Sequence, residues 1–154
     1  MWNLPHDFSV TDISPPRGFD SRRTAPGWLY ILEHNGLFKI GKTTNPRRRL
    51  REAQTWVPFA NLIGVKPFWD IHRFERTLIC GLAMHWMEGE WHGFENDKHS
   101  EFLTEGFRSF GDHDRNGNTY EFGYWIRGSG MAEVINEYNA RRGSLRCFQR
   151  DPYY

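Results

Sequence analysis

The sequence predicts a mixed α/β fold of the α+β class, in which a small sheet is covered by helices. Three observations support this prediction. Two apolar segments, 27–33 and 37–41, are separated by His34-Asn35-Gly36, and Asn-Gly is a strong hairpin signal because both residues tolerate positive φ. A capped helical segment follows at 46–55. The order of elements after the hairpin is then helix, strand, helix, which is typical of a sheet with helices packed on it.

The first elements are defined by proline and a capping residue. Residues 1–26 contain four prolines and show no sustained periodicity, which predicts an extended arm. Asn45 is a good N-cap because its side-chain oxygen can accept a hydrogen bond from a free helix amide. Pro46 fits the first helical position, where no amide is needed. A third short strand is expected at 62–65, ending near Pro67.

In the second half of the chain, the sequence predicts a long helix followed by shorter elements. Residues 70–87 carry an apolar stripe at helical spacing, a loop rich in glycine and histidine follows at 89–100, and another short helix is expected at 101–110. Beyond it we expect a turn, a strand, a helix and a basic aromatic tail, at 111–118, 119–126, 131–142 and 146–154. The chain thus divides into an extended arm, a central domain, and an α/β extension for DNA binding or dimerisation, at 1–26, 27–107 and 108–154.

The composition excludes several classes of protein. The net charge is only +1, so the chain is not a generic polycation, and a nucleic-acid surface must come from local clusters of arginine and lysine. The two cysteines form no disulfide framework, and no apolar run is long enough to span a bilayer. We therefore expect a soluble cytoplasmic protein with no membrane partner.

The segment 37–50 combines features that favour an anion. It is expected to form a short strand, a glycine-centred turn with Lys42, and a helix that opens with three arginines. Backbone amides at a helix N-terminus, a lysine and an arginine cluster can together bind a phosphate. Lys42 is therefore expected to contact a phosphate, and an exposed turn lysine is an equally good interpretation. Three arginines of the helix would point outwards to the phosphates of a nucleic acid, namely Arg47, Arg48 and Arg51.

Two charged residues fall at or inside apolar faces. Glu75 lies within the stripe of the second helix, beside Phe74 and Leu78, where a bare carboxylate is expensive to bury. It should pair with a neighbouring arginine, or it should hold Mg²⁺, which takes one or two carboxylates and keeps most of its waters. Arg49 lies at the border of the buried face of the first helix and could lean over the sheet; the alternative is a solvated basic helix.

Four motifs, taken in order, resemble the GIY-YIG nuclease superfamily. They are Gly27-Trp28-Leu29-Tyr30, Lys39-Ile40-Gly41, Arg49 and Glu75. The second motif looks most like the phage and bacterial branch in which it reads KIG. The resemblance implies a three-stranded antiparallel sheet with flanking helices and a one-metal hydrolysis of phosphodiesters.

The resemblance also implies a role for each matching residue. Tyr30 would act as or orient the general base, Arg49 would bind the scissile phosphate, and Glu75 would hold Mg²⁺ or Mn²⁺. Lys39 stands where the family has its second tyrosine, so that role falls to Tyr30, to Lys39 or to a metal-bound water, and Lys39 is included among the catalytic candidates. Ile79 stands where a histidine commonly follows the glutamate in this branch.

The main functional hypothesis is a metal-dependent endonuclease that acts on double-stranded DNA and is of phage or mobile-element type. One alternative is a DNA-binding module on the same fold that does not cut. Another is a structure-selective, single-strand or RNA nuclease. Two cuts across a duplex would need a homodimer or sequential nicking, and the sequence leaves both open.

Overall fold

The computed structural model describes residue 2 and residues 4–82, 86–88, 91–93 and 97–128. Five antiparallel strands form one sheet in the order β3-β1-β2-β5-β4. The elements follow one another as η1 (Ser21–Arg23), β1 (Gly27–His34), β2 (Leu37–Thr43), α1 (Pro46–Trp56), β3 (Asn61–Phe68), α2 (Ile71–Leu82), β4 (Trp86–Glu88), β5 (Trp91–Gly93), α3 (Asp97–Ser109) and α4 (Arg115–Gly128). The predicted α+β class with an antiparallel sheet is confirmed, and two short strands extend the expected three.

The hairpin of β1 and β2 forms as the sequence predicts. His34 pairs with Leu37, and the two residues between them have positive φ, 49° at Asn35 and 80° at Gly36. This is the backbone that a tight hairpin turn requires. The third strand is longer than predicted and includes Pro67 opposite Trp28. Proline is tolerated there because β3 is an edge strand of the sheet.

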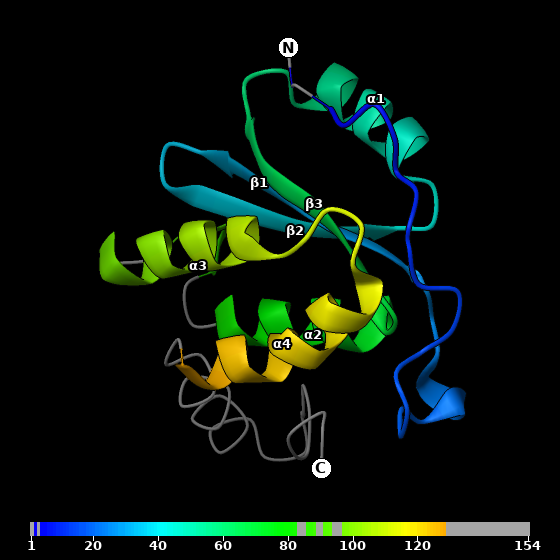
Figure 1. The fold of residues 1–154 in the computed structure, drawn as a ribbon. Helices are drawn as coiled ribbons and strands as arrows, with labels where there is room; N and C mark the ends of the chain where they lie inside the picture. Colours follow the sequence, from blue (N-terminus) through cyan, green and yellow to red (C-terminus); the bar gives the residue numbers. More distant parts are fainter. Residues whose placement is uncertain (1, 3, 83–85, 89–90, 94–96, 129–154) are drawn as a thin grey trace.

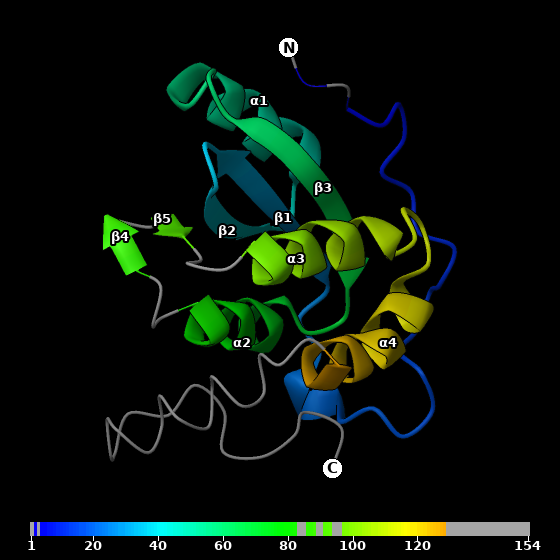
Figure 2. The same cartoon turned by 90° about the vertical axis from the view of Figure 1, so that its left-hand side faces the viewer.

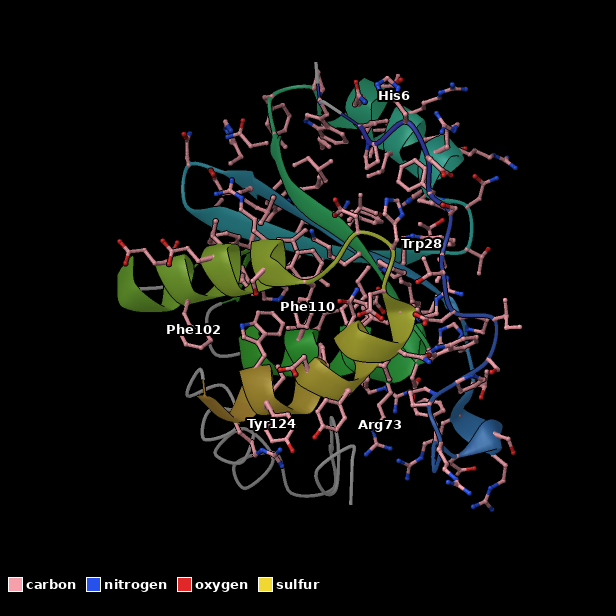
Figure 3. All side chains as sticks on the ribbon, in the orientation of Figure 1. His6, Trp28, Arg73, Phe102, Phe110 and Tyr124 are labelled. Atoms are coloured by element: carbon pink, nitrogen blue, oxygen red, sulfur yellow. The ribbon has the colours of Figure 1, made fainter. Side chains whose placement is uncertain are left out.

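Two apolar clusters cover the two faces of the sheet because side chains alternate along β1. On one face lies α1, and its cluster contains Tyr30, Leu32, Leu50, Ala60 and Val65. On the other face lie α2, α3 and α4, as Figures 1 and 2 show. This larger cluster contains many aromatic rings, among them Phe38, Phe68, Phe74, Phe107, Phe110 and Phe122. Its side chains fill the space between these helices and the sheet (Figure 3).

Four expectations for the second half of the chain are corrected. The strand expected at 119–126 is wrong, since these residues belong to α4, and the turn expected at 111–118 is cut short because α4 begins at Arg115. Thr119, Phe122 and Ile126 are buried at helical spacing, and Phe122 stacks on Phe74 with ring centroids 3.9 Å apart. The burial of one helical face has therefore overridden the strand propensity of the segment.

The loop expected at 89–100 is also wrong, because this segment contains β5 and the start of α3. The helix expected at 70–87 is shorter than predicted and ends at Leu82. His92 of β5 pairs with Phe38 of β2 on one side and with Trp86 of β4 on the other. The helix expected at 131–142 and the tail expected at 146–154 lie outside the described residues.

The described part of the arm, residue 2 and residues 4–26, runs along the outside of the domain and contains one turn of 3-10 helix (Figure 1). Near its start, Trp2 Nε1 donates to Ala60 O over 2.7 Å. Further along, Asp12 Oδ2 accepts from Asn116 N over 2.9 Å, which ties the arm to the start of α4. No helix in the ranges described is long and apolar enough to cross a membrane.

A buried arginine, Arg115, holds the start of α4 against the sheet. The Arg115 guanidinium lies 4.9 Å from the Trp28 ring and 5.1 Å from the Trp69 ring. Burial lowers its pKa, with Asp12 acting in the opposite direction. A desolvated cation held by two aromatic faces is worth about 2 kcal/mol or more. This contact ties the start of α4 to β1 and to the segment between β3 and α2.

Candidate active site

Strand β2 carries the predicted site residues on both of its faces. Phe38 and Ile40 are buried in the cluster under α2, so the alternating residues Lys39 and Gly41 face α1. Lys42 returns to the α2 side. The predicted residues therefore divide into two groups, one on each side of the same strand.

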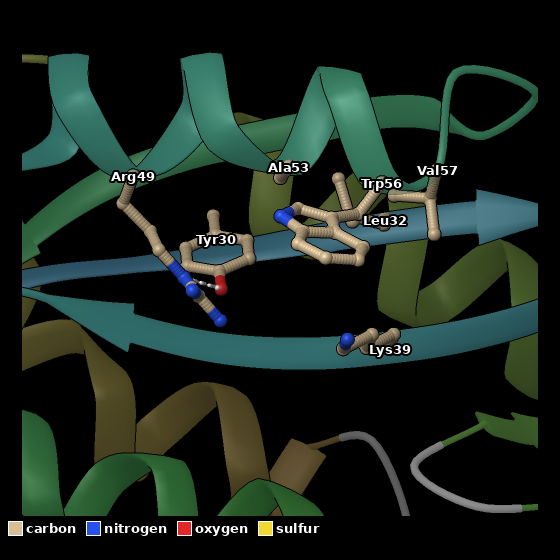
Figure 4. A pocket seen from close by; sticks show the side chains of 7 residues that line it. All are labelled: Tyr30, Leu32, Lys39, Arg49, Ala53, Trp56 and Val57. Atoms are coloured by element: carbon tan, nitrogen blue, oxygen red, sulfur yellow. Dashed lines mark hydrogen bonds between the residues drawn. The ribbon is translucent and has the colours of Figure 1, made fainter.

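On the α1 side, Arg49 leans over the sheet and contacts Tyr30. Arg49 Nε donates a hydrogen bond of 2.9 Å to the Tyr30 hydroxyl oxygen. Tyr30 is buried, whereas the Arg49 side chain is 46% exposed and lies 3.8 Å from Glu52. Figure 4 shows both polar ends directed towards β2. The geometry matches the leaning orientation expected for Arg49, and its guanidinium is both held in place and open to solvent.

Gly41 supports this pair through a close approach. The Tyr30 ring lies on the Gly41 backbone, so that a Cβ added there would overlap the ring and its hydroxyl. The expected glycine-centred turn is wrong, because β2 continues through Gly41 to Thr43. The glycine is needed for contact with an aromatic ring and has no positive φ.

Lys39 lies on the same side as Tyr30 and Arg49. Together with residues of β1 and α1 it lines a cavity of about 300 Å³, whose walls are Tyr30, Leu32, Lys39, Arg49, Ala53, Trp56 and Val57. In Figure 4 the Lys39 side chain lies on β2 across from the Trp56 ring. Lys39 thus shares a cavity with two of the other candidates, Tyr30 and Arg49.

On the α2 side, Glu75 pairs with Lys42. Lys42 Nζ lies 3.3 Å from Glu75 Oε1, and the two side chains are 36% and 19% exposed. Phe74 and Leu78, which flank the glutamate on α2, are fully buried. The expected arginine partner is wrong, because the cation comes from β2. A pair at this depth is screened less by water than a surface pair.

Both groups flank an open stretch of strand edge. Strand β5 pairs with β2 at Leu37 and Phe38. In the described ranges, no strand covers the outer edge of β2 from residue 39 to residue 43. Tyr30 and Arg49 therefore reach this edge from the α1 side, and Lys42 and Glu75 reach it from the α2 side.

The remaining arginines of α1 have different partners. Arg47 donates to His6 O over 2.6 Å and lies 5.4 Å from the Phe8 ring, so the arm engages it. Arg48 pairs with Glu52 over 3.1 Å at high exposure. Arg51 lines a second hollow of about 400 Å³. The solvated basic face that the sequence predicts is present, and part of it is covered by the arm.

The N-terminus of α1 is capped as predicted. Asn45 Oδ1 accepts from Arg48 N over 3.2 Å, and Asn45 N donates to Thr43 Oγ1 over 2.9 Å. One of the helix amides expected to hold a phosphate is therefore used by the cap. The side chains of β2 and α1 are left as the main anion ligands.

Metal binding depends on a small donor set. Among the described residues, no three His, Cys, Asp or Glu side chains gather closely enough to form a metal cluster. Glu75 supplies one hard carboxylate, which fits Mg²⁺ or Mn²⁺ because such an ion keeps several waters and accepts substrate phosphate. Ile79, one helical turn after Glu75, packs against the apolar core.

One residue near the site was missed by the sequence interpretation. Trp56, the last residue of α1, is 81% exposed. Because it follows Ala53 by three residues, its spacing predicts the buried face of the helix. Its exposure is set by where α1 ends and β3 begins, which no local pattern reveals.

The comparisons with known proteins give one match. The model of the T5orf172 domain matches residues 27–105, a range that includes Tyr30, Lys39, Arg49 and Glu75. Neither the curated proteins nor the solved structures contain a significant match to this chain.

Proposed function

The chain belongs to the T5orf172 domain family, and on this premise we propose that it is a metal-dependent endonuclease that hydrolyses phosphodiester bonds in DNA. The family favours a nuclease or DNA-binding role. The observation that carries the proposal is the arrangement around the open edge of β2. A held arginine and a tyrosine reach it from one side, and a half-buried carboxylate reaches it from the other.

Arg49 is the proposed ligand of the scissile phosphate. Its Nε is engaged by Tyr30, which fixes the plane of the guanidinium; the outer nitrogens belong to a side chain that is 46% exposed, with Nη1 3.8 Å from Glu52 Oε2. Two such donors match two oxygens of one phosphate. Negative charge grows on these oxygens as the bond breaks, so the contact strengthens in the transition state.

Tyr30 is the proposed residue that orients the attacking water. Its oxygen accepts from Arg49 and its own O–H can donate to a water at the strand edge. Lys39 lies in the same cavity and carries a positive charge. In this proposal Lys39 holds the phosphate next to the scissile one. This role is compatible with its place in the motif, where the GIY-YIG superfamily has a tyrosine.

Glu75 is the proposed holder of Mg²⁺ or Mn²⁺. When bound, such an ion neutralises the charge that develops on the leaving oxygen. Lys42, which now pairs with Glu75, lies where it can bind a phosphate of the same strand. The exposed arginines Arg48 and Arg51 would add contacts to a DNA backbone, and binding should therefore weaken as salt is raised.

A second candidate function is a DNA-binding module that does not cut. The observation that favours it is the Lys42–Glu75 ion pair, which compensates the acid with a protein cation and needs no metal. The two candidates predict the same docking of DNA and differ in the consequence of removing Glu75.

The test is cleavage of plasmid and of short labelled duplexes with Mg²⁺, with Mn²⁺ and with EDTA. We expect cutting that EDTA abolishes and that Glu75→Gln reduces at least about 100-fold, as for other single catalytic groups, while DNA binding remains. Glu105→Gln, on the exposed face of α3, is the matched control and should cut normally. Binding without cutting under all conditions would support the second candidate, and normal cutting by Glu75→Gln would contradict the first.

A further inference from the structure

Trp56 is the most exposed aromatic side chain among the described residues. It is 81% exposed, and its ring forms one wall of the cavity that also contains Lys39 and Arg49. Figure 4 shows the indole beside the Tyr30 ring, with Lys39 on the opposite side of the hollow. A large apolar ring held in water beside two cations is a surface that fits a ligand with a flat apolar face and a negative charge.

The spacing along α1 places these groups in one line. Arg49, Ala53 and Trp56 are separated by four and three residues, so they lie on one face of the helix. The axial distance from the first to the last is about 10 Å. The phosphate, sugar and base of a nucleotide can bridge this span, with the small Ala53 leaving room between the ends.

We propose that this cavity is a subsite for one unpaired nucleotide of the DNA substrate, with its base stacked on Trp56 and its phosphate held by Lys39 next to the phosphate on Arg49. The proposal rests on the proposed function in so far as Arg49 binds the scissile phosphate. Every base has a flat face that an indole can stack on, so the subsite is tolerant of sequence.

The subsite defines a substrate class. In an intact duplex each base is stacked between its neighbours, and an indole can reach a base face only where the base has been unstacked or flipped out. The preferred substrate is therefore DNA with an unpaired nucleotide at the cleaved position, such as a flap, a gap or a single strand. Fully paired duplex would use Arg48 and Arg51 and leave Trp56 without a partner.

Phe59 provides a matched control. It is also exposed, at 55%, and it lies three residues beyond Trp56. Its ring contacts His34 at 4.7 Å between centroids, and it does not line the cavity. A general effect of surface aromatic residues on DNA binding would appear at both positions, whereas a stacking subsite affects only Trp56.

The experiment measures affinity for a labelled single strand and for the fully paired duplex of the same sequence, in EDTA so that no cutting occurs. We expect Trp56→Ala to weaken single-strand binding roughly 5- to 150-fold, the range for loss of one stacked base, and to change duplex binding less than about two-fold. Trp56→Phe should keep most of the affinity, and Phe59→Ala should behave as the unaltered protein. Thermal melting of each variant checks that the fold is retained.

The proposal is overturned if Trp56→Ala weakens binding of the single strand and of the duplex equally, or weakens neither. Its failure is distinguishable from that of the proposed function. A protein that never cuts but binds single strands through Trp56 would keep the subsite and lose the nuclease. A protein that cuts duplex with no contribution from Trp56 would keep the nuclease and lose the subsite.

Discussion

The two sides of strand β2 carry different arrangements of charged side chains. On the α1 side, Arg48 and Arg49 lie 3.1 Å and 3.8 Å from the exposed Glu52 carboxylate. Arg49 is also held by the Tyr30 hydroxyl, and Lys39 lines the neighbouring cavity. On the α2 side, Lys42 and Glu75 neutralise each other against an aromatic core. The α1 side therefore has two arginines on one exposed carboxylate, whereas the α2 side has one lysine on one carboxylate.

The difference assigns separate tasks to the two sides. Two arginines that share one exposed carboxylate can still attract a phosphate, so the α1 side is suited to substrate. A paired carboxylate is suited to exchange, because a divalent ion can replace the lysine as its counter-charge.

The largest effect is expected for Arg49→Ala. We expect kcat for DNA cleavage to fall about 10²- to 10³-fold, because a donor to the transition-state charge is lost. DNA affinity should change only a few-fold. Cleavage and binding are measured on the same duplex, with Arg108→Ala on the exposed face of α3 as control. A loss confined to affinity would show that the α1 side binds DNA without assisting the reaction.

Gly41→Ala is expected to disturb the α1 side alone. The new methyl group overlaps the Tyr30 ring, and overpacking of this kind costs about 1–3 kcal/mol of stability. The displaced ring should also misplace Arg49 and lower cleavage. Urea unfolding and cleavage rates measure both effects. Gly128→Ala, where a Cβ meets open space, should be neutral, and equal stability of the two variants would contradict the close approach.

Lys42→Met is expected to act on the α2 side by removing the cation that competes for Glu75. An exposed or half-exposed ion pair is worth up to about 1 kcal/mol, so Mn²⁺ affinity should rise up to about five-fold. Isothermal titration calorimetry or Mn²⁺ electron paramagnetic resonance measures this without any cleavage assay. Lys66→Met breaks a different lysine–carboxylate pair, with Asp112, and should leave Mn²⁺ affinity unchanged. A fall in affinity for Lys42→Met would argue against counter-charge exchange.

The smallest effect concerns the caps of the two helices. Neutral, exposed Asn45 caps α1, whereas buried Asp70 accepts from Arg73 N over 3.1 Å at the start of α2. Burial raises the pKa of the Asp70 carboxyl, while the Arg73 contacts oppose the shift. Its contribution to stability is therefore fully present below the ordinary carboxyl pKa and is lost as pH rises through the folded value.

Asp70→Asn keeps an acceptor for the Arg73 amide and removes this titration. Relative to the unaltered protein, the variant should gain in free energy of unfolding as pH rises from about 3 to 7. Urea unfolding across this range measures the difference. A relative gain on acidification would mean that the carboxylate is stabilised in the folded protein.

Much of the α1 side could be predicted from local sequence. The hairpin depends on Asn35-Gly36 and the helix start on Asn45, and both signals act within a few residues. The orientation of Arg49 follows from helical spacing. The turn predicted at Gly41 was wrong, because a glycine needed for close approach and a glycine needed for a turn look the same in a sequence.

The α2 side depended more on contacts between distant segments. The position of Glu75 in an apolar stripe was visible, but its partner Lys42 lies 33 positions earlier and was expected to be a turn residue. The segment at 119–126 became a helix because it is buried under the aromatic cluster. Such outcomes depend on which faces meet in three dimensions, and a pattern within one segment contains no information about them.

The arm has a practical consequence for anyone who shortens this protein. The family match begins at residue 27, yet Trp2 of the arm donates to Ala60 O, Phe8 packs edge-on against Trp28, and His6 O accepts from the Arg47 guanidinium. Figure 3 labels His6 and Trp28 at two of these contacts. A polypeptide cut at the family boundary would expose the Trp28 ring to solvent and invite aggregation during expression. The unit to clone, fuse or crystallise therefore includes the arm as well as the residues that match the family.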